Sequence, residues 1–260
     1  MKSRKSEWEH RQEIVEICRM IHQKGYISAT DGNVSVRTGE NRVITTPTGF
    51  GKGFLTTEDL VITDLKGRVI SGKWPPSSEI LMHLCVYQLR PDVMAVIHAH
   101  PPVAIAFTIS GLSLAKCILP EVVLSLGVIP TAEYATPGTE EVPQAIKDYI
   151  IKYDALILER HGSLTVGKNL KDAYFKLEKL EHYATITFLA RMLGEVQTLS
   201  PTQIEKLAAL QTSEEEKKRS LQCLEYGVCG YPSPDKESAP DKASLRQLVA
   251  EEIEKELSKG

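Results

Sequence analysis

Two histidines close an apolar, β-branched segment near the middle of the chain. The sequence VIHAH separates His98 from His100 by one residue, and Pro101–Pro102 follows at once. Side chains alternate across a strand, so both imidazoles must project from the same face. Zinc accepts three nitrogen ligands and keeps a fourth position open. The spacing indicates a metal site at the end of a strand, although histidines also close strands as ordinary hydrogen-bonding residues.

A third histidine and a carboxylate could complete such a site. His161 lies in ERHGSLTVG, where Gly162 frees the backbone to turn so that the ring can point into a neighbouring site. Glu79 follows Ser77–Ser78 at the start of an expected helix, where the helix dipole favours a carboxylate. We therefore expect His161 and Glu79 beside the two strand-end histidines.

Uncharged donors in three turns suggest an anion site. Helix N-termini and turns that present backbone N–H groups bind phosphate without needing Lys or Arg. Gly, Asn and Ser also populate turns for conformational reasons alone, so each position is a weak indication by itself. The candidate positions are Gly32, Asn33, Thr48, Gly49, Ser77 and Ser78.

Periodicity and turn residues predict the elements that position these side chains. Expected helices cover Trp8–Lys24, the segment after Ser77–Ser78 (EILMHLCVYQL), Val103–Ser110, Thr139–Tyr153 and Lys171 to about Leu193. Expected strands cover Asn33–Arg37, Arg42–Thr45, Leu60–Asp64, Arg68–Ile70, Asp92–His100, Ala155–Glu159 and Leu164–Val166. The serines give a strong N-cap signal for the second helix. Cys117–Ile129 is apolar and ambiguous.

The composition is typical of a globular protein. Of 260 residues, 42% are apolar and 25% charged, and a net charge of -3 gives no electrostatic reason to bind nucleic acid or anionic lipid. The N-terminus has no apolar signal region, so we expect a cytoplasmic protein without a membrane partner. The five cysteines are odd in number and scattered, and we interpret all of them as reduced thiols.

Several spaced motifs in one order resemble the class II aldolase/adducin family. They are TDGNVSV, TPTGFGKGFLTTEDLVITDLKG, SSE, HAHPP, EYATPGTEE and RHGSLTVG, and the similarity covers roughly residues 14–193. The resemblance implies an α/β fold, a three-layer α/β/α domain around a central, largely antiparallel sheet. It also implies a homo-oligomer, commonly a ring-shaped homotetramer with its sites at subunit interfaces.

The resemblance assigns roles to the residues found above. It makes His98, His100 and His161 the zinc ligands, with one zinc per chain or another divalent transition metal, and Glu79 the metal-associated, proton-abstracting carboxylate. The six turn residues become the phosphate-binding positions. Where aldolases of the family use a tyrosine of the neighbouring subunit, this chain has Glu121 in LPEVV. Glu121 is our candidate second acid/base, expected to be buried because its surroundings are apolar.

The expected reaction is reversible cleavage of a ketose 1-phosphate, of the fuculose or 5-deoxypentulose kind, to dihydroxyacetone phosphate and a short aldehyde. A sugar-phosphate dehydratase such as a methylthioribulose-1-phosphate dehydratase, an epimerase on the same scaffold, and a non-catalytic adducin-like interaction domain are the alternatives. We expect residues 1–199 to form the catalytic domain. Residues 200–260 should form a helical C-terminal extension, with a linker near residues 231–242 and a final helix at Ala243–Leu257.

Overall fold

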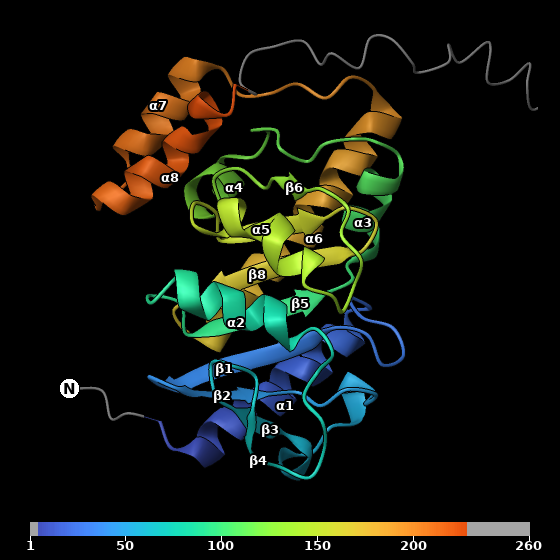
Figure 1. Cartoon of the computed structure of the whole chain (residues 1–260). Coiled ribbons are helices and arrows are strands. Elements are labelled where there is room, and N and C mark those ends of the chain that lie inside the picture. Colours follow the sequence, from blue (N-terminus) through green and yellow to red (C-terminus); the bar gives the residue numbers. More distant parts are fainter. Residues whose placement is uncertain (1–4, 228–260) are drawn as a thin grey trace, which may run out of the picture. The chain divides into compact units, whose positions relative to one another are not determined.

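A mixed sheet forms the centre of the fold in the computed structural model, which describes residues 5–227 (Figure 1). Across these residues the eight strands run in the order β4-β3-β2-β1-β5-β8-β7-β6. All neighbours are antiparallel except β6 and β7, which are parallel. The strands are β1 (Asn33–Gly39), β2 (Arg42–Thr45), β3 (Val61–Thr63), β4 (Val69–Ser71), β5 (Ala95–Ala99), β6 (Thr131–Ala132), β7 (Ala155–Leu158) and β8 (Gly162–Gly167).

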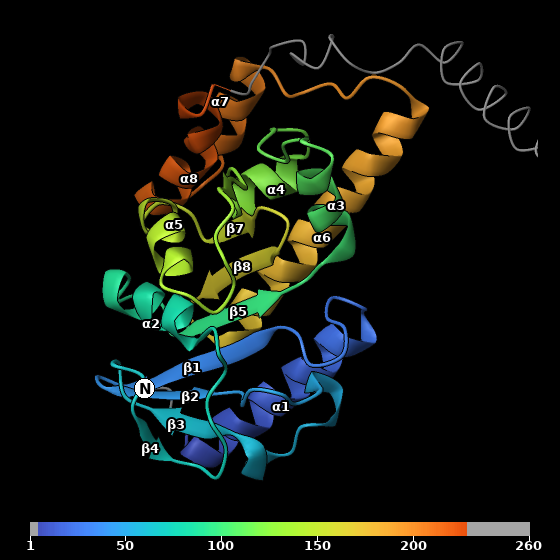
Figure 2. The same ribbon diagram turned by 45° about the vertical axis from the view of Figure 1, so that its right-hand side comes forward.

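Helices cover both faces of the sheet, as Figures 1 and 2 show. One face packs against α2 (Ile80–Leu89) and α5 (Glu141–Ile150). The other packs against α1 (Glu7–Gln23) and α6 (Leu170–Leu193), while α3 (Pro102–Ile109) and α4 (Pro120–Ser125) add to the layer beside α6. The expected three-layer α/β/α fold with a largely antiparallel sheet is confirmed.

Alternation along the central strands decides what faces each layer. Val96 and His98 of β5 point toward α2, because Val96 packs in the cluster that α2 and α5 build. Ala95, Ile97 and Ala99 point the opposite way, toward α1 and α6. Both faces of this strand are therefore buried, which explains its almost continuous apolar sequence.

Two helices after residue 200 pack back onto the domain. They are α7 (Pro201–Ala209) and α8 (Glu214–Glu225), and both contact α4. A disulfide joins Cys117, just before α4, to Cys223 of α8. Reading all five cysteines as reduced was therefore wrong. The two lie 106 residues apart, and only the return of α8 to α4 brings them together.

The expected elements form, with shifted ends. The second helix begins one residue later than its serines suggest: Glu79 is the N-cap, without a side-chain cap, and Ser77 Oγ accepts the Glu79 N–H at 3.3 Å. The ambiguous apolar segment contains α4, and the two short η helices (Lys52–Phe54 and Thr57–Asp59) were not expected.

Part of the expected C-terminal extension lies outside the described residues. This holds for the linker near 231–242, the helix at Ala243–Leu257 and Cys229. By its contacts the chain divides after Cys229, and α7 and α8 belong to the first unit. Within residues 5–227, no helix combines the length and apolarity needed to cross a bilayer.

Candidate metal centre

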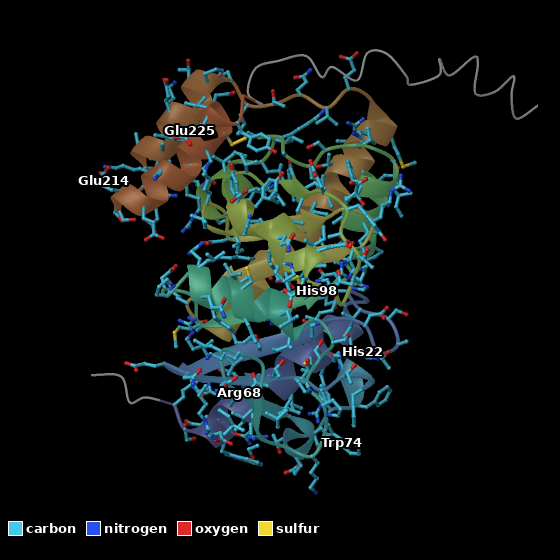
Figure 3. All side chains as sticks on the ribbon, viewed as in Figure 1. His22, Arg68, Trp74, His98, Glu214 and Glu225 are labelled. Carbon is cyan, nitrogen blue, oxygen red and sulfur yellow. A yellow bond between two sulfur atoms is a disulfide. The ribbon has the colours of Figure 1, made fainter. Side chains whose placement is uncertain are left out.

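His98 and His100 converge at the end of β5. His98 is fully buried between the sheet and α2 (Figure 3), and its Nδ1 lies 2.9 Å from the carbonyl oxygen of Ser163 on β8. Because a carbonyl can only accept, Nδ1 is the donor of this hydrogen bond, and Nε2 is left to face the neighbouring rings. That atom lies 3.0 Å from Nε2 of His100. Two imidazole nitrogens thus meet at one point.

The turn between β7 and β8 brings the third imidazole to this point. Arg160 adopts a positive φ of 55°, and its N–H donates to Thr108 Oγ1, which fixes the turn. The ring centroid of His161 lies 4.7 Å from that of His98 and 5.2 Å from that of His100. The three rings come from one strand end and one turn, as the His98–His100 spacing and the turn at Gly162 predicted.

Gly162 makes this convergence possible. A Cβ at this position would stand 2.5 Å from the Ala99 carbonyl oxygen and 2.8 Å from ring carbons of both His98 and His100. Real side chains do not approach backbone so closely. The glycine following His161 is therefore required for close packing against the histidine pair.

Glu79 faces the same point from the start of α2. Its Oε1 lies 3.1 Å from His161 Nε2, and its Oε2 lies 3.3 Å from His98 Nε2. Asn33 on β1 donates to Oε2 at 3.0 Å. Burial raises the pKa of Glu79, but hydrogen bonds and attraction from His161 and His98 outweigh it, so the pKa is lowered and the carboxylate is ionised.

This donor set fits a divalent transition metal. A carboxylate close to imidazole nitrogens that carry lone pairs is repelled by them unless a proton or a metal cation lies between. Burial, together with repulsion from the other histidines, lowers the pKa of His100 to about 3, so this ring is neutral, as a ligand must be. The candidate ligand atoms of His98, His100 and His161 all lie within 4.8 Å of one another. Tetrahedral zinc with Zn–N bonds of about 2.0–2.1 Å would need nitrogens roughly 3.3 Å apart.

A cavity of about 410 Å³ opens beside the histidines. His100, His161 and Glu79 lie in its wall, and His98 lies behind them. All six turn residues singled out in the sequence line it as well: Gly32, Asn33, Thr48, Gly49, Ser77 and Ser78. Three turns far apart in the sequence therefore surround one cavity. A molecule filling it would touch the histidine group at one end and uncharged donors elsewhere.

Other residues of the cavity were missed. Lys52, Asp31 and the pair Pro137–Gly138 also form its wall. Asp31 Oδ2 lies 3.7 Å from His100 Nδ1, so its carboxylate favours a proton on that nitrogen and leaves Nε2 free. The signal for Asp31 was available, since it precedes Gly32–Asn33 in TDGN. Lys52 lies in GFGKGF and resembles any surface lysine in sequence.

A buried chain of hydrogen bonds lies next to the histidine group. His83, one helical turn after Glu79, is fully buried. Its Nδ1 lies 2.7 Å from Ser35 Oγ, which in turn lies 2.8 Å from the Tyr87 hydroxyl. Burial and the neighbouring His98 lower the pKa of His83 to about 3, although Glu79 opposes this. The His83 ring is therefore neutral.

Glu181 of α6 fixes the backbone that follows His100. Its two carboxylate oxygens accept the N–H groups of Val103 and Ala104 at 2.8 and 2.9 Å. Pro101, the N-cap residue of α3, has no side-chain acceptor to offer these N–H groups, so a carboxylate 78 residues away supplies it. The direction of the chain after the histidine pair thus depends on α6.

Glu121 does not join the group within one chain. It lies in the first turn of α4, its side chain is exposed, and it is not part of the cavity wall. The expectation of a buried carboxylate was wrong, because the apolar residues around it, Val122 and Val123, turn inward while Glu121 turns outward.

Known proteins resemble this chain in sequence and in fold. Residues 12–188 match the model of the Class II Aldolase and Adducin N-terminal domain. An L-fuculose phosphate aldolase of Methanococcus maripaludis is 38% identical over 181 residues, which is 70% of this chain and 97% of the relative. The structure of an L-fuculose 1-phosphate aldolase superposes with a TM-score of 0.72 at 30% identity, covering 77% of this chain and 95% of the other.

Relatives with other activities are nearly as similar. A 3-oxo-tetronate 4-phosphate decarboxylase of Pectobacterium atrosepticum is 32% identical over 188 residues, 71% of this chain and 86% of the relative. A methylthioribulose-1-phosphate dehydratase of Methylococcus capsulatus is 33% identical over 183 residues, 65% of this chain and 88% of the relative.

Proposed function

Since the chain belongs to the class II aldolase and adducin family and is an enzyme of the lyase class, we propose that it is a zinc-dependent aldolase acting on a ketose 1-phosphate. The products would be dihydroxyacetone phosphate and a short aldehyde. One observation carries the proposal: three histidines and Glu79 converge beside a cavity whose wall includes the six uncharged turn residues.

The metal assignment is supported by the kind of ligand. Imidazole nitrogens suit zinc and other late transition metals, whereas magnesium and calcium prefer oxygen. His98, His100 and His161 would hold the ion, and Glu79 would lie against it. When bound, the metal supplies Lewis-acid polarisation of the substrate's carbonyl and hydroxyl oxygens.

The remainder of the cavity supports a phosphorylated substrate. Asn33, Thr48, Ser77 and Ser78 offer amide and hydroxyl groups, while the turns at Gly32 and Gly49 have positive φ and bring backbone close to the cavity. Together they can hold a phosphate by hydrogen bonds. All the relatives compared above carry a phosphate in the names of their substrates. Binding energy from this remote group would position the reacting carbon.

Glu79 is the proposed base. In the condensation direction it removes a proton from the carbon next to the carbonyl of dihydroxyacetone phosphate, and in the cleavage direction it returns that proton. Its lowered pKa ensures the ionised form but makes it a weak base while it contacts His98 and His161. We propose that substrate binding separates the carboxylate from these rings, which strengthens it as a base.

A second group must exchange the proton of the aldehyde-side oxygen. Glu121 is exposed on α4, so it could serve only at the site of a neighbouring chain. The proposal therefore includes the homotetramer that the family resemblance implies. Inactive Glu121→Gln and Glu79→Gln chains, mixed together, should then regain activity, because some sites receive both glutamates from different chains. Mixtures that stay inactive would remove Glu121 from the reaction.

A dehydratase is the second candidate function. The relative of that activity is 33% identical, and the replacement of the expected tyrosine by Glu121 departs from the aldolase pattern. An epimerase or a decarboxylase would use the same polarised carbonyl. The convergence of three histidines and Glu79 argues against a non-catalytic interaction domain, because binding a protein partner does not require such a group.

Product analysis separates these activities. The zinc-loaded protein should release dihydroxyacetone phosphate from one member of a panel of ketose 1-phosphates. Dehydrated sugar phosphate in its place would favour the dehydratase, and carbon dioxide from a 3-oxo acid phosphate would favour the decarboxylase. The cytoplasmic location and the boundary between residues 199 and 200 remain predictions.

A further inference from the structure

Lys52 is a buried cation in the cavity wall that the reaction described above does not use. Only 1% of its surface is exposed, although lysine is among the residues least often buried. It begins the short η helix after the turn at Thr48–Gly49, and it lines the same cavity as those residues. Its charge is therefore next to the space where substrate would bind.

The ammonium group has only partial compensation. Its Nζ donates to the carbonyl oxygens of Thr30 at 2.6 Å and Phe50 at 2.7 Å. Among residues 5–227, no carboxylate oxygen lies within 4.0 Å of it. An ammonium has three N–H donors, and a buried charge without an ionic partner is costly. The two carbonyl oxygens accept from two of these donors but carry no full negative charge to balance the ammonium.

The two bonds also place this charge between two of the proposed phosphate-binding turns. Thr30 begins the turn that continues to Gly32 and Asn33, and Phe50 follows Thr48 and Gly49. Lys52 thus joins both turns by a single atom. Burial lowers the pKa of Lys52, and attraction to Cys18, Asp31 and Glu79 opposes this shift only in part.

We propose that Lys52 supplies the positive charge that selects a phosphorylated substrate, by ion pairing with the phosphate held between the two turns. This inference rests on the proposed function and changes one feature of it: the phosphate site is charged, and does not depend on uncharged donors alone. A sugar without the phosphate would leave the Lys52 charge uncompensated, so the residue discriminates against it.

Binding of inorganic phosphate to the zinc-loaded, full-length protein tests this without any turnover. Lys52→Met has similar length and no charge, and it should weaken phosphate binding on the order of ten-fold to a hundred-fold, the range for a hydrogen bond to a charged group. Lys52→Arg keeps the charge and should bind within a few-fold of the unmodified protein. Lys66→Met, an exposed lysine outside the cavity, is the matched control and should bind normally. Zinc content should be equal in all four proteins.

The possible results distinguish the role of Lys52 from the proposed function as a whole. Equal binding by Lys52→Met and the unmodified protein overturns this inference and leaves the proposed function standing. Equal loss in Lys52→Met and Lys52→Arg would assign Lys52 to holding the turns and would also overturn it. Failure of the unmodified protein to bind phosphate would overturn both proposals. If Lys52→Met does not fold, Lys52→Gln takes its place in the same comparison.

Discussion

Two partly buried charged clusters in this protein differ in how completely their groups are paired. Asp154, beside a cavity of about 490 Å³, has Lys176, Arg90 and Arg219 at 2.9, 3.0 and 3.5 Å. Arg90 and Lys176 also donate to backbone carbonyls. Beside the smaller histidine cavity, Lys52 is a cation without a carboxylate partner among the described residues. There the imidazoles of His98 and His161 face the Glu79 carboxylate. Cavity size therefore does not distinguish the two clusters, whereas incomplete pairing does.

The complete pairing of the Asp154 cluster indicates that its role is structural. Asp154 joins β7 to α6, α8 and the end of α2, and burial raises its pKa less than Lys176, Arg219 and Arg90 lower it. Nothing further is needed to stabilise it. Around Glu79 the unpaired atoms include Asn33 Oδ1 and His83 Nε2, within the residues that the structure describes. Such atoms are costly unless a ligand or metal compensates them.

Of the substitutions proposed, Glu79→Gln in the histidine cluster should have the largest effect, a loss of turnover. The amide fills the same space but cannot accept a proton, so turnover should fall on the order of 10²–10⁴-fold, the usual contribution of a general base. Steady-state kinetics with the identified substrate measure this. Exposed Glu58→Gln is the control. Unchanged exchange of the substrate's C–H proton in Glu79→Gln would show that another group is the base.

Asp154→Ala should damage stability and spare chemistry. Removing the shared carboxylate leaves three cations facing one another, and breaking a buried ion pair typically costs about 3 kcal/mol or more. Urea unfolding measures the loss. Asp92→Ala removes a carboxylate that also contacts Arg90 but is 61% exposed, so it should cost less than about 1 kcal/mol. If folded Asp154→Ala lost zinc or turnover, the division between the clusters would be wrong.

The metal-free protein should lose stability as the pH falls from about 6.5 toward 3. His83 and His100 are held neutral with pKa values of about 3, whereas an unfolded histidine titrates near 6.5. The unfolded state then binds more protons, so each group contributes stability above pH 6.5 that disappears as pH drops. The slope should approach roughly 1.4 kcal/mol per pH unit for each.

Unfolding of chelator-treated protein at several pH values measures this slope. His83→Gln should make it shallower, and His182→Gln, an exposed histidine of α6, should not. An unchanged slope in His83→Gln would mean that His83 is not held neutral.

Glu181→Gln should have the smallest effect. An amide leaves one acceptor for the two N–H groups at the start of α3, and loss of a helix cap costs about 1 kcal/mol. Because α3 follows His100, zinc affinity measured by chelator competition should also weaken, unlike in Glu178→Gln on the same helix. Unaltered zinc affinity would limit Glu181 to a capping role.

Local rules predicted much of this site from the sequence. Alternation across a strand placed His98 and His100 on one face, and a glycine after His161 signalled a tight turn. Turn composition also indicated six of the uncharged residues of the cavity wall, whereas Thr30, Pro47 and Pro137–Gly138 were missed. These features depend on short stretches of chain whose geometry is fixed by a few neighbouring residues.

Features that need distant segments to meet were missed. Lys52 becomes a buried cation only because its η helix packs against α1, where the His22 ring lies against Gly53. Cys117 and Cys223 pair only because α8 returns to α4. Glu181 caps α3 only because α6 packs against that helix. Tertiary packing, which no local pattern encodes, decides all three.

Metal content shows directly whether His98, His100 and His161 hold a zinc ion. Elemental analysis of protein purified without chelator should give one zinc per chain, and the same analysis of His98→Ala, which removes the buried ligand, should give almost none. Activity should disappear from the unmodified protein on treatment with a strong chelator and return with zinc. Protein that contains no transition metal, and whose activity survives the chelator, would show that the histidine group does not hold a catalytic metal.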